Sequence, residues 1–204
     1  AMELVDDGKG RVTGAILFNR DTGKKVCVSA RAVILATGGS GQIRLQGFPT
    51  SNHVGATGDG LVLAYRQGCR LIHLDSYQYH PSGACYPEAL AGQLVTEAIR
   101  SVGAQVVNAE GIHFIDEMAY RDVLAGAIIK EIAEGRGIKT PHGKTGVWLD
   151  TPMVDLKKGA GTLANQFPGL IHRFERYNID PAKQPVLIYP TLHYQNGGIR
   201  VDSE

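Results

Sequence analysis

Short apolar runs at the start of the chain have the lengths and turn residues of β-strands. Residues 11–18 and 24–29 are two such runs, and the segment between them contains Asp21 and Gly23. This combination predicts a β-hairpin. Residues 32–36 (AVILA) form a continuous apolar run, which is typical of a strand buried on both faces.

Apolar positions at helical spacing follow. Residues 61–68 are an apolar stretch that begins after residues 57–60 and ends in glycine, which predicts a short helix with a Thr or Asp cap and a glycine stop. Residues 122–134 predict a second helix. Five further positions form an amphipathic stripe: Leu163, Phe167, Leu170, Ile171 and Phe174. Pro168 interrupts this stripe, which predicts two helices or a new start at Pro168.

The remaining apolar runs predict short strands. They are residues 70–75, 104–108, 113–115, 147–150 and 186–189. Residues 78–93 are rich in Pro, Gly, Tyr and Ala, and this composition predicts a long loop. A loop of this length in a compact domain usually carries function.

Composition and charge exclude several classes of partner. The 204 residues are 43% hydrophobic and 20% charged, with a formal net charge of +1. Such a balance favours a globular protein with a real core and argues against a nucleic-acid surface or a basic membrane-binding face. Apolar runs stay well short of the ~18 residues of a membrane-spanning helix, and the first residues do not resemble a signal peptide. We therefore expect a soluble chain without direct membrane insertion.

Cysteine and glycine usage points to a reducing compartment and a bound ligand. The three cysteines are far apart, which predicts neither a disulfide framework nor a metal site and favours a cytoplasmic location. The chain has 26 glycines, and they cluster without a regular period. Clustered glycines indicate tight turns and a backbone that approaches a ligand closely.

A glycine-rich turn is the first candidate site. Residues 37–41 follow the predicted strand 32–36. Glycine lets a backbone lie against a nucleotide without a Cβ clash, but βα turns also use glycine for packing. The full G-x-G-x-x-G fingerprint does not occur. The turn alone therefore leaves nucleotide binding and simple packing open.

Two histidines and a charged pair are further candidates. His80 precedes a proline, which restricts its backbone, and His193 lies shortly before a pair of glycines. Glu97 and Arg100 would be neighbours on a helical turn. A purely structural role is also open for these residues. A histidine of this kind can be a hydrogen-bonded loop residue, and Glu97 and Arg100 can be a surface ion pair.

Taken in order, these motifs resemble the flavoprotein subunit family of fumarate reductases and succinate dehydrogenases, with L-aspartate oxidase and the soluble fumarate reductases as relatives. The matching elements cover nearly the whole chain. They are Ala36-Thr37-Gly38-Gly39, Thr57-Gly58-Asp59-Gly60, Gln78 to Gly83, Thr96-Glu97, Arg121-Asp122, and His193-Tyr194 before Gly197-Gly198.

The resemblance implies an α+β chain, a fragment of a Rossmann-like FAD-binding domain with an inserted α+β capping domain. Residues 1–75 would be the trailing part of the first FAD-binding segment, residues 76–185 the capping domain, and residues 186–204 the start of the returning segment. The family's amino-terminal fingerprint and its carboxy-terminal stretch lie outside this chain, so we expect the chain to be inactive alone.

The resemblance also implies a cofactor and a set of site residues. FAD would be held by Ala36, Thr37, Gly38, Gly39 and Asp59. A small dicarboxylate would be bound by His80, Thr96 and His193. Arg121 would transfer the proton, and Glu97 and Arg100 would serve as its relay.

An arginine that acts as a general acid needs such a relay to replace the proton that it loses. Free deprotonation of an arginine at pH 7 would cost roughly 9 kcal/mol, because it spans about seven pKa units at about 1.36 kcal/mol each. The proton must therefore leave as the carbanion forms and be replaced from Glu97.

The partners implied by the resemblance are a dicarboxylate and an iron–sulfur electron-transfer subunit, with attachment to the inner face of a membrane through partner subunits. The sequence departs from the family after the Thr-Glu motif, where it reads Arg100-Ser101-Val102-Gly103. Three alternatives stay open: an L-aspartate oxidase-like enzyme, a non-catalytic capping module, and a generic nucleotide-binding domain of another family.

Overall fold

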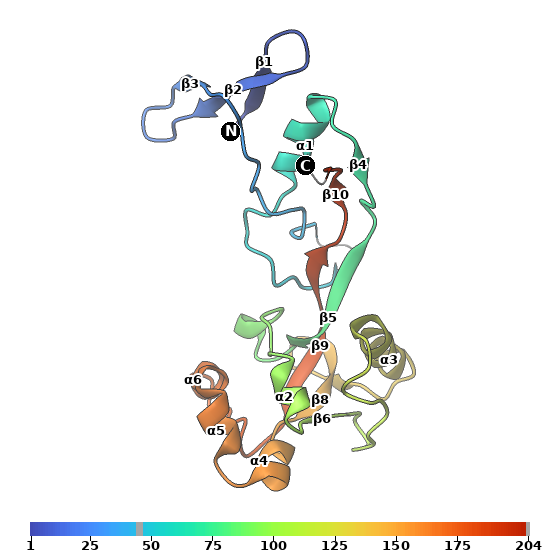
Figure 1. Ribbon diagram of the computed structural model, residues 1–204. Coiled ribbons are helices and arrows are strands. Elements are labelled where there is room, and N and C mark those ends of the chain that lie inside the picture. The colour runs from blue at the N-terminus through green and yellow to red at the C-terminus, as the bar shows by residue number, and fades with distance from the viewer. Residues whose placement is uncertain (44–46, 203–204) are drawn as a thin grey trace. The chain divides into compact units, whose positions relative to one another are not determined.

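A computed structural model describes residues 1–43 and 47–202 (Figure 1). The chain forms two compact units. Unit 1 comprises residues 1–43, 52–77 and 195–204, and unit 2 comprises residues 44–51 and 78–194. Each unit is described by itself.

Unit 1 begins with an antiparallel sheet of three strands in the order β1-β2-β3. The strands are β1 (Glu3–Asp6), β2 (Val12–Phe18) and β3 (Lys25–Ser29). Ile16 pairs with Cys27 in the centre of the β2–β3 hairpin. The predicted hairpin is confirmed.

The predicted strand at residues 32–36 does not form. The segment has no regular structure, and Ile34 is 91% exposed. A strand exists only when a neighbour supplies hydrogen-bond partners for its backbone. Within the described residues, no strand pairs with this segment, so the prediction of a strand buried on both faces is wrong for this structure.

Helix α1 (Asp59–Arg66) follows the glycine-rich turn and confirms the first predicted helix. Its N-cap is Gly58, whose φ is 84°, and no side chain caps the helix, so the expected Thr or Asp cap is wrong. The predicted glycine stop is confirmed, since Gly68 has a φ of 82°. Only two residues of the predicted strand 70–75 form β4 (Leu71–Ile72), which pairs antiparallel with β10 (Gly198–Ile199).

Unit 2 is built on a five-stranded sheet in which β5-β9-β8-β6 are consecutive neighbours and β7 also pairs with β8. The strands are β5 (Tyr77–Ala84), β6 (Gln105–Val107), β7 (Ile138–Lys139), β8 (Thr145–Asp150) and β9 (Val186–Gln195). Strand β8 is antiparallel to both β6 and β9. The predicted strands at 147–150 and 186–189 are confirmed, although β9 is longer than expected.

The long loop predicted at residues 78–93 is wrong, because β5 occupies its first half. Pro81 lies within this strand, and β5 is at the edge of the sheet. An edge strand tolerates proline because it pairs on one side only. Gly83 is required by packing, since a Cβ there would lie 2.6 Å from the Cβ of Thr191 in β9. Only the remainder is irregular, with a short 3-10 turn at Glu88–Leu90.

Helices cover the sheet of unit 2. They are α2 (Ala98–Ser101), α3 (Arg121–Ala133), α4 (Met153–Lys158), α5 (Thr162–Gln166) and α6 (Pro168–Glu175). In Figure 1, α3 lies on one side of the strands and α4, α5 and α6 lie on the other. Helix α6 begins at Pro168, so the stripe is two helices. The shared core includes Val106, Leu124, Ile128, Val147, Leu149, Leu163, Phe174 and Ile188.

Among the residues that the structure describes, no helix is both long and apolar enough to cross a membrane.

We expect Leu163→Ala to lower the free energy of unfolding of unit 2 by about 2–5 kcal/mol, because it leaves a cavity in the core. Leu163 in α5 is fully buried. Urea unfolding followed by the fluorescence of Trp148, the single tryptophan, measures the change, since Trp148 lies in β8. The control is Leu156→Ala in α4, where the side chain is 78% exposed and the loss should stay below about 0.5 kcal/mol. Equal losses of unfolding free energy in the two variants would contradict the placement of Leu163 in the core.

Candidate active site

Two imidazoles meet on neighbouring strands of unit 2. His80 lies on β5 and His193 on β9. Their ring centroids are 5.3 Å apart and their planes are inclined by 71°. These residues are more than a hundred positions apart in sequence, and the pairing of β5 with β9 brings them together.

His80 is buried and neutral. Its pKa is lowered from 6.5 to about 3, mainly by burial and also by Arg121, His193 and Arg100, against an opposing effect of Glu97. Its Nδ1 accepts a hydrogen bond from the backbone N–H of Ser82 at 3.2 Å. A neutral imidazole that accepts at Nδ1 carries its proton on Nε2. His80 therefore presents an Nε2–H donor.

His193 is held by a serine from a distant part of the chain. Its Nδ1 lies 2.8 Å from the Ser51 hydroxyl, which is also 3.3 Å from the carbonyl oxygen of Leu192. Burial is the main cause that lowers the pKa of His193, and Arg121 lowers it further. The neutral ring is favoured near pH 7.

Arg121 and Glu97 form the charged part of the site. Arg121, the first residue of α3, donates from Nε and Nη2 to Glu97 Oε2 at 3.0 and 2.6 Å. Its Nη1 donates to Gln78 Oε1 at 2.8 Å. The hydrogen bond from Arg121 is the main cause that lowers the pKa of Glu97, so the carboxylate is ionised. Glu97 Oε2 also lies 3.8 Å from His80 Nε2.

Arg100 lies behind Glu97 and is almost completely buried, with 3% of its surface exposed. Its Nη2 is 3.5 Å from Glu97 Oε1, and its Nη1 donates to the backbone carbonyl of Glu117. Burial lowers the pKa of Arg100, whereas the charges of Glu97 and Glu117 raise it.

Thr96 has a different setting. Its side chain is exposed, and its hydroxyl accepts from the backbone N–H of Ala98 at the start of α2, at 3.4 Å. The structure thus joins five of the six expected substrate and proton-transfer residues in one network. Thr96 precedes Glu97 in the chain, but its hydroxyl contacts the backbone of α2 and not this network.

Sequence reasoning missed two polar residues of this network. Gln78 accepts from Arg121, and Ser51 contacts His193. Gln78 stands two positions before His80, so the alternation of a strand could have indicated it, had β5 been recognised. Ser51 offers no local signal, since only the folded chain brings it to His193.

The arrangement suits a small dianion. Arg121 has five N–H donors, of which the bonds above use three. Its remaining donors and the Nε2–H of His80 can bind carboxylate oxygens, and such charge-assisted bonds are strong where water is excluded. In the part of the chain that the structure describes, no three His, Cys, Asp or Glu side chains gather to hold a metal ion.

The expected cofactor residues lie in unit 1, around the glycine-rich turn: Ala36, Thr37, Gly38, Gly39 and Asp59. The Gly58 N–H donates to the Gly39 carbonyl at 2.9 Å, which joins the turn to the start of α1. Gly60 is required here, since a Cβ would lie 1.8 Å from Thr37 Oγ1. Gly38 has a φ of 78°, and the space in front of it is open.

Thr37 and Asp59 line a cavity of 400 Å³ in unit 1, together with Val33, Ile34 and Leu35. An exposed glycine turn beside an open apolar cavity fits part of a flavin site, because it offers backbone for polar groups and an apolar wall for a ring system.

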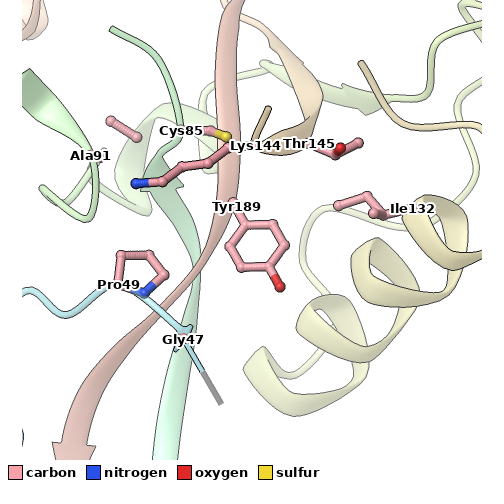
Figure 2. Close-up of a pocket in the computed structure, with 9 residues that line it drawn as sticks. Gly47, Pro49, Cys85, Ala91, Ile132, Lys144, Thr145 and Tyr189 are labelled. Atoms are coloured by element: carbon pink, nitrogen blue, oxygen red, sulfur yellow. The ribbon is translucent and has the colours of Figure 1, made fainter. Parts of the chain in front are cut away.

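A separate cavity of 230 Å³ lies in unit 2, with the side chains of Cys85, Lys144 and Tyr189 around it (Figure 2). None of the expected site residues lines it. Burial raises the pKa of Cys85 to about 11, only partly opposed by Lys144, so its thiol stays protonated and is a poor nucleophile.

Comparisons with known proteins bear on the family of the chain. A family model described as "FAD binding domain" matches residues 1–204. One subunit of the fumarate reductase (CoM/CoB) of Methanothermobacter marburgensis is 37% identical over 206 residues, which cover 98% of this chain and 35% of that protein. L-aspartate oxidase of Streptomyces coelicolor is 34% identical over 213 residues, which cover 99% of this chain and 34% of that protein.

Solved structures agree. A structure described as quinol-fumarate reductase with menaquinol molecules has a TM-score of 0.83 and 32% identity to this chain, covering 98% of it and 36% of the solved chain. The chain spans about a third of the length of these relatives.

These similarities define a class of flavoprotein: the chain belongs to the FAD-binding-domain family whose members include flavoprotein subunits of fumarate reductase and L-aspartate oxidase. The resemblance inferred from the motifs is confirmed, together with the FAD cofactor and the α+β class. The domain boundaries at residues 75 and 185 and the residue roles stay predictions.

We expect His80 to remain neutral well below pH 6.5. Because the unfolded chain binds this proton near pH 6.5 and the folded protein only near pH 3, His80 contributes stability above pH 6.5 that is lost as the pH falls from 6.5 towards 3. The ring ¹⁵N chemical shifts of His80 should keep the values of a neutral Nε2–H imidazole across most of this range. A titration midpoint near pH 6.5 would contradict the buried, neutral ring.

Proposed function

We propose that the full-length protein containing this chain is an FAD-dependent oxidoreductase that interconverts fumarate and succinate, or a closely related unsaturated and saturated dicarboxylate. The observation that carries this proposal is the network of His80, His193, Arg121, Glu97 and Arg100 in unit 2. The similarity to fumarate reductase subunits supports the same conclusion.

The histidines and Arg121 bind and orient the dicarboxylate in this proposal. His80 donates from Nε2 as a neutral imidazole. His193, held by Ser51, faces the same space. Thr96 is the remaining proposed substrate contact, and its exposed side chain is free to reach a ligand.

Arg121 transfers the proton. The chemistry that FAD supplies when bound is hydride transfer to or from one substrate carbon. Arg121 donates a proton to the adjacent carbon during reduction and accepts it during oxidation. Glu97 makes this role feasible, because its carboxylate contacts two of the Arg121 nitrogens and can pass on to Arg121 a proton that it accepts from Arg100. Arg100 lies 3.5 Å from the other oxygen of Glu97 and is the next group of the relay.

The turn at Ala36, Thr37, Gly38 and Gly39, with Asp59, would hold part of the FAD. Residues 1–75 and 186–204 would belong to the FAD-binding domain and residues 76–185 to a capping domain. An iron–sulfur subunit is the electron partner we propose, on a cytoplasmic protein attached to a membrane through its partners.

A second candidate is an L-aspartate oxidase-like activity, which the relative at 34% identity favours. Aspartate is a dicarboxylate of the same length, so the same donors would bind it. The two candidates differ in the electron acceptor and in the substrate, because aspartate carries an amine that succinate lacks. Both activities can be assayed on one preparation with fumarate, succinate and L-aspartate.

Arg121→Gln in the full-length protein should lower kcat for fumarate reduction by about 10²–10⁴-fold, because it removes the proton donor. The flavin absorbance of the purified protein should remain unchanged, since Arg121 does not belong to the cofactor residues. The measurement is steady-state turnover with a reduced dye.

Arg136→Gln is the matched control. Arg136 also pairs closely with a glutamate, Glu131, but it contacts neither histidine. The control should keep kcat within about threefold of the wild type. Near-normal turnover in Arg121→Gln would remove Arg121 from the mechanism.

A further inference from the structure

Arg100 is a poor end point for a proton relay, because its side chain is buried. Only 3% of Arg100 is exposed, so it cannot exchange protons with bulk water directly. Its Nε and Nη2 are buried and make no hydrogen bond to any described residue. Buried groups of this kind are commonly satisfied by an internal water molecule.

The substrate side cannot resupply the relay during turnover. Arg121 and Glu97 are partly exposed, with 31% and 39% of their side chains accessible. If the proposed function is correct, a dicarboxylate covers this side in the reacting complex. The proton must then enter from the opposite side of Glu97, where Arg100 lies.

Glu117 and His113 lie on that opposite side. The backbone carbonyl of Glu117 accepts from Arg100 Nη1, and the charge of Glu117 favours the protonated form of Arg100. Glu117 Oε1 is 2.6 Å from His113 Nε2. The side chain of Glu117 is 14% exposed and that of His113 is 42% exposed, so exposure increases step by step from Arg100 to solvent.

The backbone holds this pair in place. Glu117 Oε1 also accepts from the N–H of Val106 in β6, at 3.1 Å. His113 is next to the same strand, because it forms an antiparallel bridge with Val107. A pair fixed at both ends by β6 keeps its geometry better than two surface side chains that meet by chance.

We propose that His113 and Glu117 form the solvent-side end of the proton relay, which then runs from His113 through Glu117, Arg100 and Glu97 to Arg121. The inference rests on the proposed function. A histidine is suited to this position because its imidazole can both accept and donate a proton, and 42% of the His113 side chain is exposed.

The proton balance is simple. When Arg121 loses a proton to the substrate carbon, the ionised Glu97 accepts a proton from Arg100 and passes it to Arg121. Arg100 regains its proton from the Glu117–His113 pair, which adjoins it, and His113 takes one from bulk water. One proton moves from solvent to the substrate, and no electron travels along this path.

The test uses the full-length, FAD-loaded protein with His113→Ala. We expect kcat for fumarate reduction to fall by about tenfold or more. Added imidazole should restore most of the rate, because a free imidazole can occupy the space of the missing ring and exchange protons with Glu117. The dissociation constant of succinate from the oxidised protein should not change.

The matched control is His142→Ala. His142 Nδ1 lies 3.3 Å from Glu88 Oε2, so it also forms an exposed histidine–glutamate pair in unit 2, but it has no link to Arg100. Its kcat should equal that of the wild type, with or without imidazole.

A His113→Ala protein with kcat within about twofold of the control would overturn the inference. A loss of kcat that imidazole does not restore would also overturn it, because it would indicate a structural role. If the wild-type protein turns over no four-carbon dicarboxylate, the proposed function fails first and the relay fails with it.

Discussion

The ion pair between Arg121 and Glu97 is the interaction on which the candidate site depends. It joins the first residue of α3 to the residue before α2, and Glu97 in turn contacts Arg100 and approaches His80. Two guanidinium groups in a partly buried place would repel one another without this carboxylate, and the buried Arg100 would be the more costly of the two. Burial is the main cause that lowers the pKa of His80 and keeps it neutral; the charges of Arg121 and Arg100 add to this effect, and Glu97 opposes it. One carboxylate therefore holds both guanidinium groups of the candidate site together.

Local pattern was enough to predict much of the fold. The β2–β3 hairpin, the helices α1 and α3, and the start of α6 at Pro168 all follow from residues close together in sequence. Predictions failed where a strand depends on a distant partner. Residues 32–36 have strand composition but find no neighbour among the described residues, whereas β5 contains Pro and Gly and still forms because β9 pairs with it.

The candidate site shows the same division. The residue types at His80, Glu97, Arg100, Arg121 and His193 could be read from ordered motifs, and the structure connects them. The protonation states of these residues could not be read from the sequence, because the pKa of His80 depends on burial and on guanidinium groups from two other elements. Ser51 and Gln78 were missed for a related reason, since their roles exist only once separate segments of unit 2 are packed together.

The most direct measurement is a crystal structure of the full-length protein with a non-reactive four-carbon dicarboxylate. The account predicts that one carboxylate lies within hydrogen-bond distance of His80 Nε2 and that the ligand also contacts His193 and the free donors of Arg121. A dicarboxylate bound elsewhere, or one that leaves His80 and Arg121 without contact to it, would contradict the account.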